Sequence, residues 1–395
     1  MKALFYIFLL FLALPSTAIG QEISNDSTNT KQKHPMFLSI KGENGFALKT
    51  NDYLKETGKV DFSSLSLRYG ISPTNDSWAN KAFRMPYGGI GFSMLQHEDK
   101  AFGHPFTLYL FQGDRVTPIF KWMSLFYECQ VGYSGNWGHY DRFRQPDNIT
   151  IGSSENVYVG GNLYLKFNLS QHLDINLGMG VCHFSNGATM MPNKGMNIAS
   201  PFLEIAYKLN EYKKTTDTAR TLPPRPNKTD HEIIATFSSR QKYYSVVGTG
   251  ISTQYVNHSH RIYGLSYSRL FVSNYKYRWG PSVELLYDES SCAKATRDYN
   301  PADGKYYDNV HLGDPKDRFS LGISLKGEVK MPYCSYFANL GYDIIHGNDY
   351  DTRLYEIIGV KCDLTENLFG VFGIRATRFS KAQFFCWSLG YTFKK

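Results

Sequence analysis

One stretch, from His172 to Leu209, constrains the fold more than any other part of this chain. Within it, the odd-numbered residues from Leu173 to Val181 are all apolar, and His183 and Ser185 continue the same series. The even-numbered series consists of Asp174, Asn176, Gly178, Gly180, Cys182 and Phe184. Because side chains alternate between the two faces of a β-strand, His183 and Ser185 share the apolar face. A soluble sheet would bury that face, whereas a transmembrane β-barrel turns it toward lipid.

The start of the chain predicts export. Residues 1–20 contain Lys2, an apolar run and a small-residue end, which together are typical of a cleaved secretory signal peptide. Residues 21–35 are polar, and we expect them to be disordered. No run of eighteen apolar residues follows residue 20, so we expect no membrane helix. The 29 tyrosines, 27 phenylalanines and 34 glycines favour a multi-pass β-barrel in the outer membrane.

Alternating segments recur along residues 36–209 and predict an eight-stranded barrel. The candidate strands are 37–48, 62–71, 86–96, 105–113, 124–135, 156–168, 172–185 and 198–209. Eight strands is the smallest closed barrel of this kind. The turn at 169–171 is short, whereas the segments 136–155 and 186–197 are long. Because short turns face the periplasm and long loops face outward, His183 and Ser185 are predicted to lie near the outer leaflet.

The second part of the chain predicts eight further strands. Residues 210–230 are charged and proline-rich, and we interpret them as a periplasmic linker. In residues 231–395, the segment 232–256 counts as one long or broken strand, and 290–317 counts as a long loop. The total is about sixteen strands, in one barrel or in two. The linker favours two tandem barrels, because a continuous barrel would have a short turn there.

The second half also looks like a decayed copy of the first. The segment KFNLSQHL, which ends at Leu173, aligns with KCDLTENL, which ends at Leu368. The same offset places His183-Phe184-Ser185 on Arg378-Phe379-Ser380. An arginine does not deprotonate at neutral pH. We therefore predict a degenerate second half without the chemistry of the first.

The charge argues against a nucleic-acid partner, and the cysteine spacing argues against a metal site. The net charge of +8 is too small and too dispersed for a nucleic-acid partner, although it suits anionic lipid head groups. The six cysteines show no close pairing and no metal-ligand spacing, so we expect buried thiols. The pair His258 and His260 predicts a turn rather than a metal site. We expect no cofactor and no metal, and the sequence leaves the oligomeric state open.

The His-x-Ser pair points to ester chemistry. A histidine and a serine two positions apart on one strand can approach hydrogen-bonding distance, which activation of a serine nucleophile requires. Because both side chains share the lipid-facing side, we predict a lipid-facing acyl hydrolase. The alternative is a catalytically silent structural or transport barrel of the outer membrane.

The segment HFSNG (183–187), followed by Pro192-Asn193-x-Gly195-x-Asn197, resembles the outer-membrane lipid A 3-O-deacylases (PagL) and their acyloxyacyl-hydrolase-type relatives. The resemblance is tight over residues 180–210 and loose over the rest of the first half. It implies an eight-stranded barrel that cleaves an ester-linked acyl chain from lipid A of lipopolysaccharide at the outer leaflet.

Carried over by position, the resemblance implies that Ser185 is the nucleophile and His183 the base. It also implies that Asn193, together with Asn186, donates hydrogen bonds to the oxyanion. The acidic residue of the family, a glutamate, falls on Asn197. An amide oxygen can orient the imidazole but cannot offset its positive charge, so we expect a slower enzyme. Asp141 and Glu155 are alternative partners for His183.

Overall fold

The structure is a computed structural model that describes residues 34–73, 79, 82–210, 228–244, 254–347, 352–379 and 381–394. The predicted signal peptide at 1–20, most of the polar segment 21–35 and most of the linker 210–230 lie outside the described residues. In these ranges no helix has both the length and the apolar character needed to cross a membrane.

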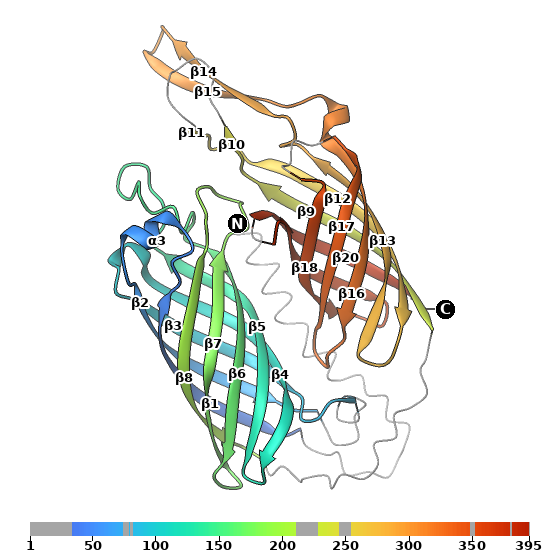
Figure 1. Cartoon of the computed structure of the whole chain (residues 1–395). Helices are drawn as coiled ribbons and strands as arrows, with labels where there is room; N and C mark the ends of the chain where they lie inside the picture. The colour runs from blue at the N-terminus through green and yellow to red at the C-terminus, as the bar shows by residue number, and fades with distance from the viewer. Residues whose placement is uncertain are drawn as a thin grey trace. The chain divides into compact units, whose positions relative to one another are not determined.

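The first barrel is a closed antiparallel sheet in which each strand pairs with the next and β8 closes on β1 (Figure 1). Its strands are β1 (Met36–Ala47), β2 (Asp61–Ile71), β3 (Tyr87–His97), β4 (Gly103–Phe120), β5 (Met123–Trp137), β6 (Asn156–Asn168), β7 (Leu173–Ser185) and β8 (Met196–Lys208). Each predicted segment corresponds to one strand, although β4 runs longer than expected. The helix α3 (Asp52–Glu56) lies in the loop between β1 and β2, at the end of the barrel where β7 finishes.

The outer face of the first barrel is apolar and exposed. Leu65, Met94 and Val181 each have 60% or more of their surface exposed. Alternate residues on the same strands are buried, as the pattern of β2 and β3 shows. An apolar outside over a buried, polar inside is the arrangement of a transmembrane β-barrel.

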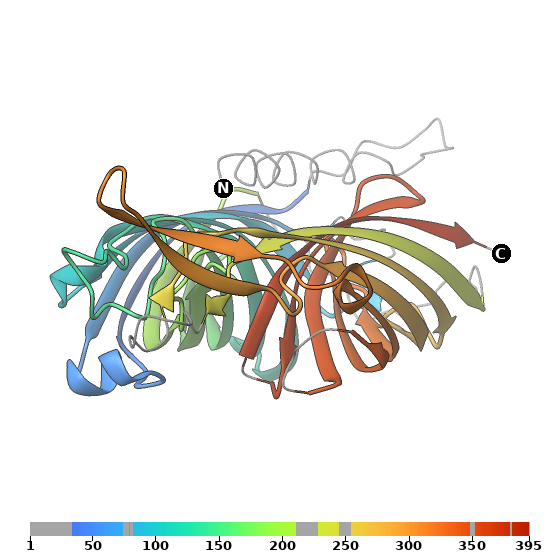
Figure 2. The same ribbon diagram turned by 90° about the horizontal axis from the view of Figure 1, so that it is seen from above.

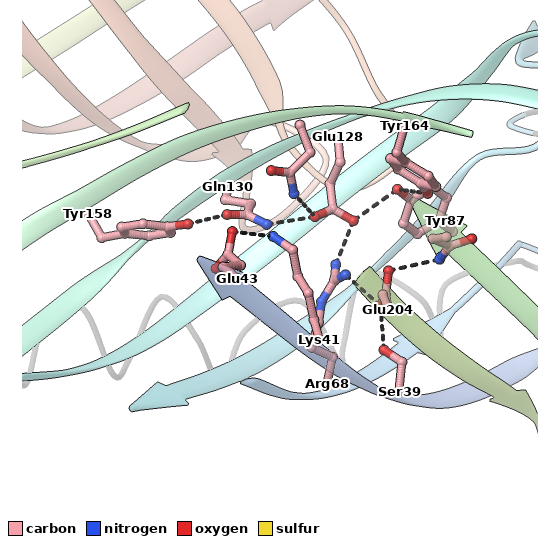
Figure 3. Close-up of polar contacts among 12 residues, drawn as sticks. Ser39, Lys41, Glu43, Arg68, Tyr87, Glu128, Gln130, Tyr158, Tyr164 and Glu204 are labelled. Atoms are coloured by element: carbon pink, nitrogen blue, oxygen red, sulfur yellow. Dashed lines mark hydrogen bonds and ion pairs between the residues drawn. The ribbon is translucent and has the colours of Figure 1, made fainter. Parts of the chain in front are cut away.

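The interior of the first barrel is filled by a charged network (Figure 3). Arg68 donates to Glu204 at 2.6 Å and to Glu128 at 2.5 Å, and all three side chains are buried. Lys41 pairs with Glu43 at 2.9 Å. Buried charges of this kind require partners, because an unpaired ion away from water is strongly destabilising. Glu204 of β8 therefore points into the barrel.

The second barrel is closed separately, so the alternative of a single sixteen-stranded barrel is wrong. Its strands are β9 (Thr229–Arg240), β12 (His260–Val272), β13 (Tyr277–Asp288), β16 (Phe319–Val329), β17 (Ser335–His346), β18 (Leu354–Asp363), β19 (Leu368–Thr377) and β20 (Lys381–Lys394). Two tandem eight-stranded barrels, the favoured prediction, are confirmed.

Two small hairpins accompany the second barrel. The segment 232–256, predicted as one long or broken strand, is broken: β9 ends at Arg240, and β10 (Tyr243–Tyr244) pairs with β11 (Gln254–Tyr255) in a separate sheet. The predicted loop 290–317 contains β14 (Lys294–Asn300) and β15 (Lys305–His311). Figure 2 shows β14 and β15 extending as a long two-stranded arm. Alternation alone does not separate a barrel strand from a hairpin that leaves the barrel wall.

The turns before β7 and β19 have the same hydrogen bonds, as the internal repeat predicts. Leu169 N and Ser170 N both donate to Leu173 O, at 3.0 and 3.1 Å. At the matching positions, Leu364 N and Thr365 N both donate to Leu368 O, at 2.9 and 3.0 Å. The Ser170 and Thr365 hydroxyls accept equivalent backbone bonds. The two matching sequence segments therefore form turns with the same hydrogen-bond pattern.

The prediction of buried thiols needs two corrections, because two cysteines form a disulfide and only Cys386 of the four thiols is buried. Cys334 and Cys362 form a disulfide, whereas Cys129, Cys182, Cys292 and Cys386 are thiols. The disulfide follows from strand register, because Ser335 lies opposite Lys361 and their neighbours therefore meet at the strand ends. The two cysteines are 28 residues apart in sequence, so no short cysteine spacing indicated the disulfide.

Candidate active site

The site lies at the end of β7, where an inward-pointing aromatic fixes the strand. Phe184 is buried, and its ring centroid lies 4.7 Å from that of Trp137 and 5.1 Å from that of Tyr158. Because neighbours on a strand point to opposite faces, His183 and Ser185 lie on the outer side. Val181, the preceding residue on that face, is 61% exposed.

His183 is held by the neighbouring strand. It lies directly opposite Asn197 in the β7–β8 register, and its Nδ1 is 2.8 Å from Asn197 Oδ1. Gly195 allows the imidazole to sit where it does: a Cβ at Gly195 would fall 2.6 Å from His183 Cε1, and its φ of +76° also favours glycine. The glycine of the PNxGxN segment therefore makes room for the histidine ring.

Ser185 receives a hydrogen bond from the following loop. Asn193 Nδ2 donates to Ser185 Oγ at 2.8 Å, and Ser185 itself is buried. The other end of the same amide, Asn193 Oδ1, is also buried and has no hydrogen-bond partner. An amide N–H fixed against a serine oxygen is placed to donate to negative charge that develops beside that oxygen.

Asn186 lies next to Ser185 in sequence, but its amide is directed elsewhere. Its Nδ2 donates to Ser153 Oγ at 2.9 Å, in the segment that precedes β6. The contact connects two loops. A role for Asn186 at the oxyanion stays a prediction.

Three residues with carboxylate side chains lie near the site in sequence, and each makes a contact away from His183. Asp141 accepts hydrogen bonds from the backbone N–H groups of Arg144 at 2.8 Å and Phe143 at 2.9 Å, and these bonds lower the pKa of its carboxyl group. Glu204 belongs to the interior network. Glu155 contributes its backbone carbonyl to Ser153 Oγ at 2.7 Å. Asn197 is the residue that the structure brings to His183.

Residues that sequence reasoning missed hold the loops of the site together. Asn51 accepts from Leu54 N at 3.1 Å as the N-cap of α3, accepts from Thr150 Oγ1 at 3.2 Å, and donates to Gly195 O at 3.5 Å. Gly195 N donates to Thr150 O at 2.9 Å. An asparagine directly before a helical segment is a recognisable N-cap signal, but its two further bonds depend on tertiary structure.

An apolar surface leads to the site along the same outer face. Val159 lies opposite His183 in the β6–β7 register and is 49% exposed. Met179 and Val181 continue the exposed series along β7. A hydrocarbon chain lying against the barrel would therefore reach the histidine and the serine along apolar side chains.

The second barrel lacks an equivalent loop. At the positions that match His183 and Phe184, Arg378 and Phe379 have φ values of 56° and 54° in a tight turn, and β20 begins at Lys381. Ser380 lies outside the described residues. No group of three or more His, Cys, Asp or Glu side chains in the described ranges is placed to hold a metal ion.

Three comparisons with known proteins bear on this geometry. The family model described as acyloxyacyl hydrolase, C-terminal domain, matches residues 241–395. No curated protein matches the chain. A crystal structure of the outer membrane enzyme PagL is 17% identical with a TM-score of 0.29, and the match covers 42% of this chain and 97% of that one.

Other solved structures are similar over more of the chain. The siderophore receptor PirA from Pseudomonas aeruginosa is 10% identical with a TM-score of 0.23, and the match covers 92% of this chain and 82% of the receptor. The β-domain of the Bordetella autotransporter BrkA is 11% identical with a TM-score of 0.20, covering 92% and 99%. All three TM-scores are below 0.5.

The fold defines a protein of two membrane-type β-barrels, the first of which carries a serine, a histidine and two amides at one rim. The match to the acyloxyacyl hydrolase C-terminal domain model covers residues 241–395, which lie in the second half of the chain. The sequence resemblance pointed to residues 180–210, whereas the family match falls on the second barrel. The family-model match therefore lies in one half of the chain, and the candidate site lies in the other.

Proposed function

We propose that the first barrel is an outer-membrane serine esterase that removes an ester-linked acyl chain from lipid A of lipopolysaccharide. The observation that carries the proposal is the pair of hydrogen bonds that fix His183 to Asn197 and Ser185 to Asn193. A serine, an oriented imidazole and an amide donor are the components that acyl transfer needs.

The reaction would proceed in two halves. Ser185 Oγ attacks the ester carbonyl carbon while its proton passes to His183 Nε2, and the sugar oxygen then leaves with that proton. A water molecule next attacks the acyl-serine, gives its proton to His183 and releases the fatty acid as Ser185 recovers its hydroxyl hydrogen. Asn193 Nδ2 donates to the oxyanion in both halves.

The position of the site supports a lipid substrate. His183 and Ser185 follow the exposed apolar residues of β7, at the end of the barrel that carries the long segments 138–155 and 186–195. Long loops face outward in barrels of this kind, where lipopolysaccharide forms the leaflet. Acyl chains of that lipid would lie along Val159 and Val181.

A silent structural or transport barrel is the second candidate. The interior of the first barrel disfavours a pore, because Arg68 and Glu128 are buried and paired across it. Lys41 is also buried there, in a pair with Glu43 of the same strand. Single-channel conductance of the purified protein tests this alternative directly.

Mass spectra of lipid A test the esterase. Cells that express the wild type should show lipid A lighter by one hydroxy fatty acid, and cells that express Ser185→Ala should not. Both proteins must be present as heat-modifiable barrels. The same mass loss in Ser185→Ala cells would remove the proposal.

A further inference from the structure

A threonine hydroxyl lies on the side of Asn197 that faces away from His183. Asn197 Nδ2 donates to Thr50 Oγ1 at 3.2 Å. Thr50 Oγ1 in turn donates to the carbonyl oxygen of Leu48 at 3.4 Å. The single hydrogen of the hydroxyl is thus used on Leu48, so the threonine oxygen serves Asn197 as an acceptor.

This contact determines which way the asparagine amide is turned. A primary amide has an oxygen at one corner and an NH2 group at the other, and the two differ only in the partners they accept. With its NH2 group on Thr50, Asn197 presents Oδ1 to His183 Nδ1 at 2.8 Å. That oxygen can only accept, so Nδ1 carries the ring hydrogen and Nε2 keeps its lone pair.

We propose that Thr50 is a positioning residue, which turns the Asn197 amide so that His183 is held in the tautomer a general base requires. The proposal rests on the proposed esterase function of the same site. The Thr50 hydroxyl bonds to Asn197 and to the Leu48 carbonyl, and in this role it acts only through Asn197.

The need for Thr50 follows from the amide at position 197. A carboxylate has an acceptor oxygen at either corner, so His183 Nδ1 faces an acceptor whichever way the carboxylate is turned. An amide turned the wrong way would offer NH2 to Nδ1 and favour the tautomer that donates from Nε2. In a serine protease, an amide at the acid position that enforces the wrong tautomer lowers kcat about ten-thousandfold.

Backbone hydrogen bonds hold Thr50 where this role requires it. Leu48 N donates to Asn197 O at 2.8 Å, which extends the β1–β8 ladder by one step. Thr50 N donates to Leu48 O at 2.8 Å. The next residue, Asn51, caps α3 and binds Gly195. These hydrogen bonds therefore fix the position of the turn that carries the Thr50 hydroxyl.

Paired substitutions in the full chain test the role. Thr50→Val should lower Ser185-dependent hydrolysis of lipopolysaccharide micelles about threefold to tenfold, the factor that corresponds to one net hydrogen bond. Thr50→Ser keeps the hydroxyl and should restore the wild-type rate. Thr57→Val removes another exposed hydroxyl from the same loop, one that binds Tyr53 O, and should leave the rate unchanged.

A double-mutant cycle separates positioning from loop stability. In an Asn197→Asp background both side-chain oxygens accept, so Thr50→Val should have little effect on the rate there. An equal loss in both backgrounds would show that Thr50 acts on the loop as a whole and would overturn the proposal. Wild-type rates for Thr50→Val would overturn it as well.

The tautomer of His183 gives a readout that does not need activity. Nitrogen-15 spectra of histidine-labelled protein in detergent, with His183 assigned from His183→Ala, should show hydrogen on Nδ1 in the wild type and a mixed population in Thr50→Val. If the wild type hydrolyses no lipopolysaccharide, the esterase proposal fails, and these spectra still decide the role of Thr50. Identical spectra for the two proteins would refute it.

Discussion

His183 lies directly opposite Asn197 in the β7–β8 register, and the two side chains meet at 2.8 Å. The pair belongs to the sheet itself rather than to a loop. Barrel closure fixes the register, so the barrel that crosses the membrane also fixes the partner of the imidazole.

Ser185→Ala and His183→Ala should each abolish ester hydrolysis and leave a folded barrel. Neither side chain takes part in the interior network, so the loss should be confined to chemistry. Lipid A mass spectra measure activity, and heat-modifiable migration on a gel measures folding. Retained deacylation in Ser185→Ala would withdraw the nucleophile assignment.

Alanine substitutions of Asn193 and Asn186 should have different effects on kcat. Asn193→Ala removes the donor to Ser185 Oγ and should lower kcat on the order of a hundredfold or more, as for an oxyanion donor. Asn186→Ala removes the bond to Ser153, so we expect a stability loss of about 0.5–1.5 kcal/mol and little change in kcat. Comparable kcat losses in the two variants would place Asn186 at the oxyanion too.

The charged interior should dominate stability. Arg68→Ala leaves Glu128 and Glu204 buried without their cation, and we expect the free energy of unfolding to fall by about 3–5 kcal/mol. Lys55→Ala breaks an exposed pair with Asp52 and should change it by less than about 1 kcal/mol. Urea unfolding of both variants in the same detergent gives the comparison. Equal effects would show that the interior pairs contribute no more than a surface pair.

Placing a histidine in the second barrel should not create a second site. Arg378 and Phe379 form a tight turn before β20, where the first barrel has the loop that carries Asn193 and Gly195. The double variant Ser185→Ala, Arg378→His should therefore be inactive toward lipopolysaccharide. Hydrolysis by this variant would mean that the second barrel supplies the missing groups from elsewhere.

The strand pattern of the first barrel could be predicted from sequence because each strand alternates between lipid and interior. The same alternation explains why Asn197 lies on the face of His183, since the two residues are opposite each other in the β7–β8 register. The hydrogen bonds of Thr50, Asn51 and Thr150 could not be predicted, because they join loops that are distant in sequence. The Cys334–Cys362 disulfide could not be predicted either, because it depends on the register between β17 and β18. In the second half, the alternating pattern predicted the correct number of barrel strands. It did not show that residues 294–311 form a hairpin separate from the barrel sheet.

Asn197→Glu should raise the hydrolysis rate near neutral pH, whereas Asn197→Leu should lower it sharply. The native amide already accepts the Nδ1 hydrogen of His183 at 2.8 Å, so orientation is present and only the charge that would stabilise an imidazolium is missing. A carboxylate supplies that charge, and leucine supplies neither charge nor acceptor. Initial rates of acyl release from lipopolysaccharide, measured from pH 5 to 9, compare the three proteins. Equal rates for all three would mean that Asn197 has no part in catalysis, and alanine variants of Asp141 and Glu155 would then identify the residue that orients His183.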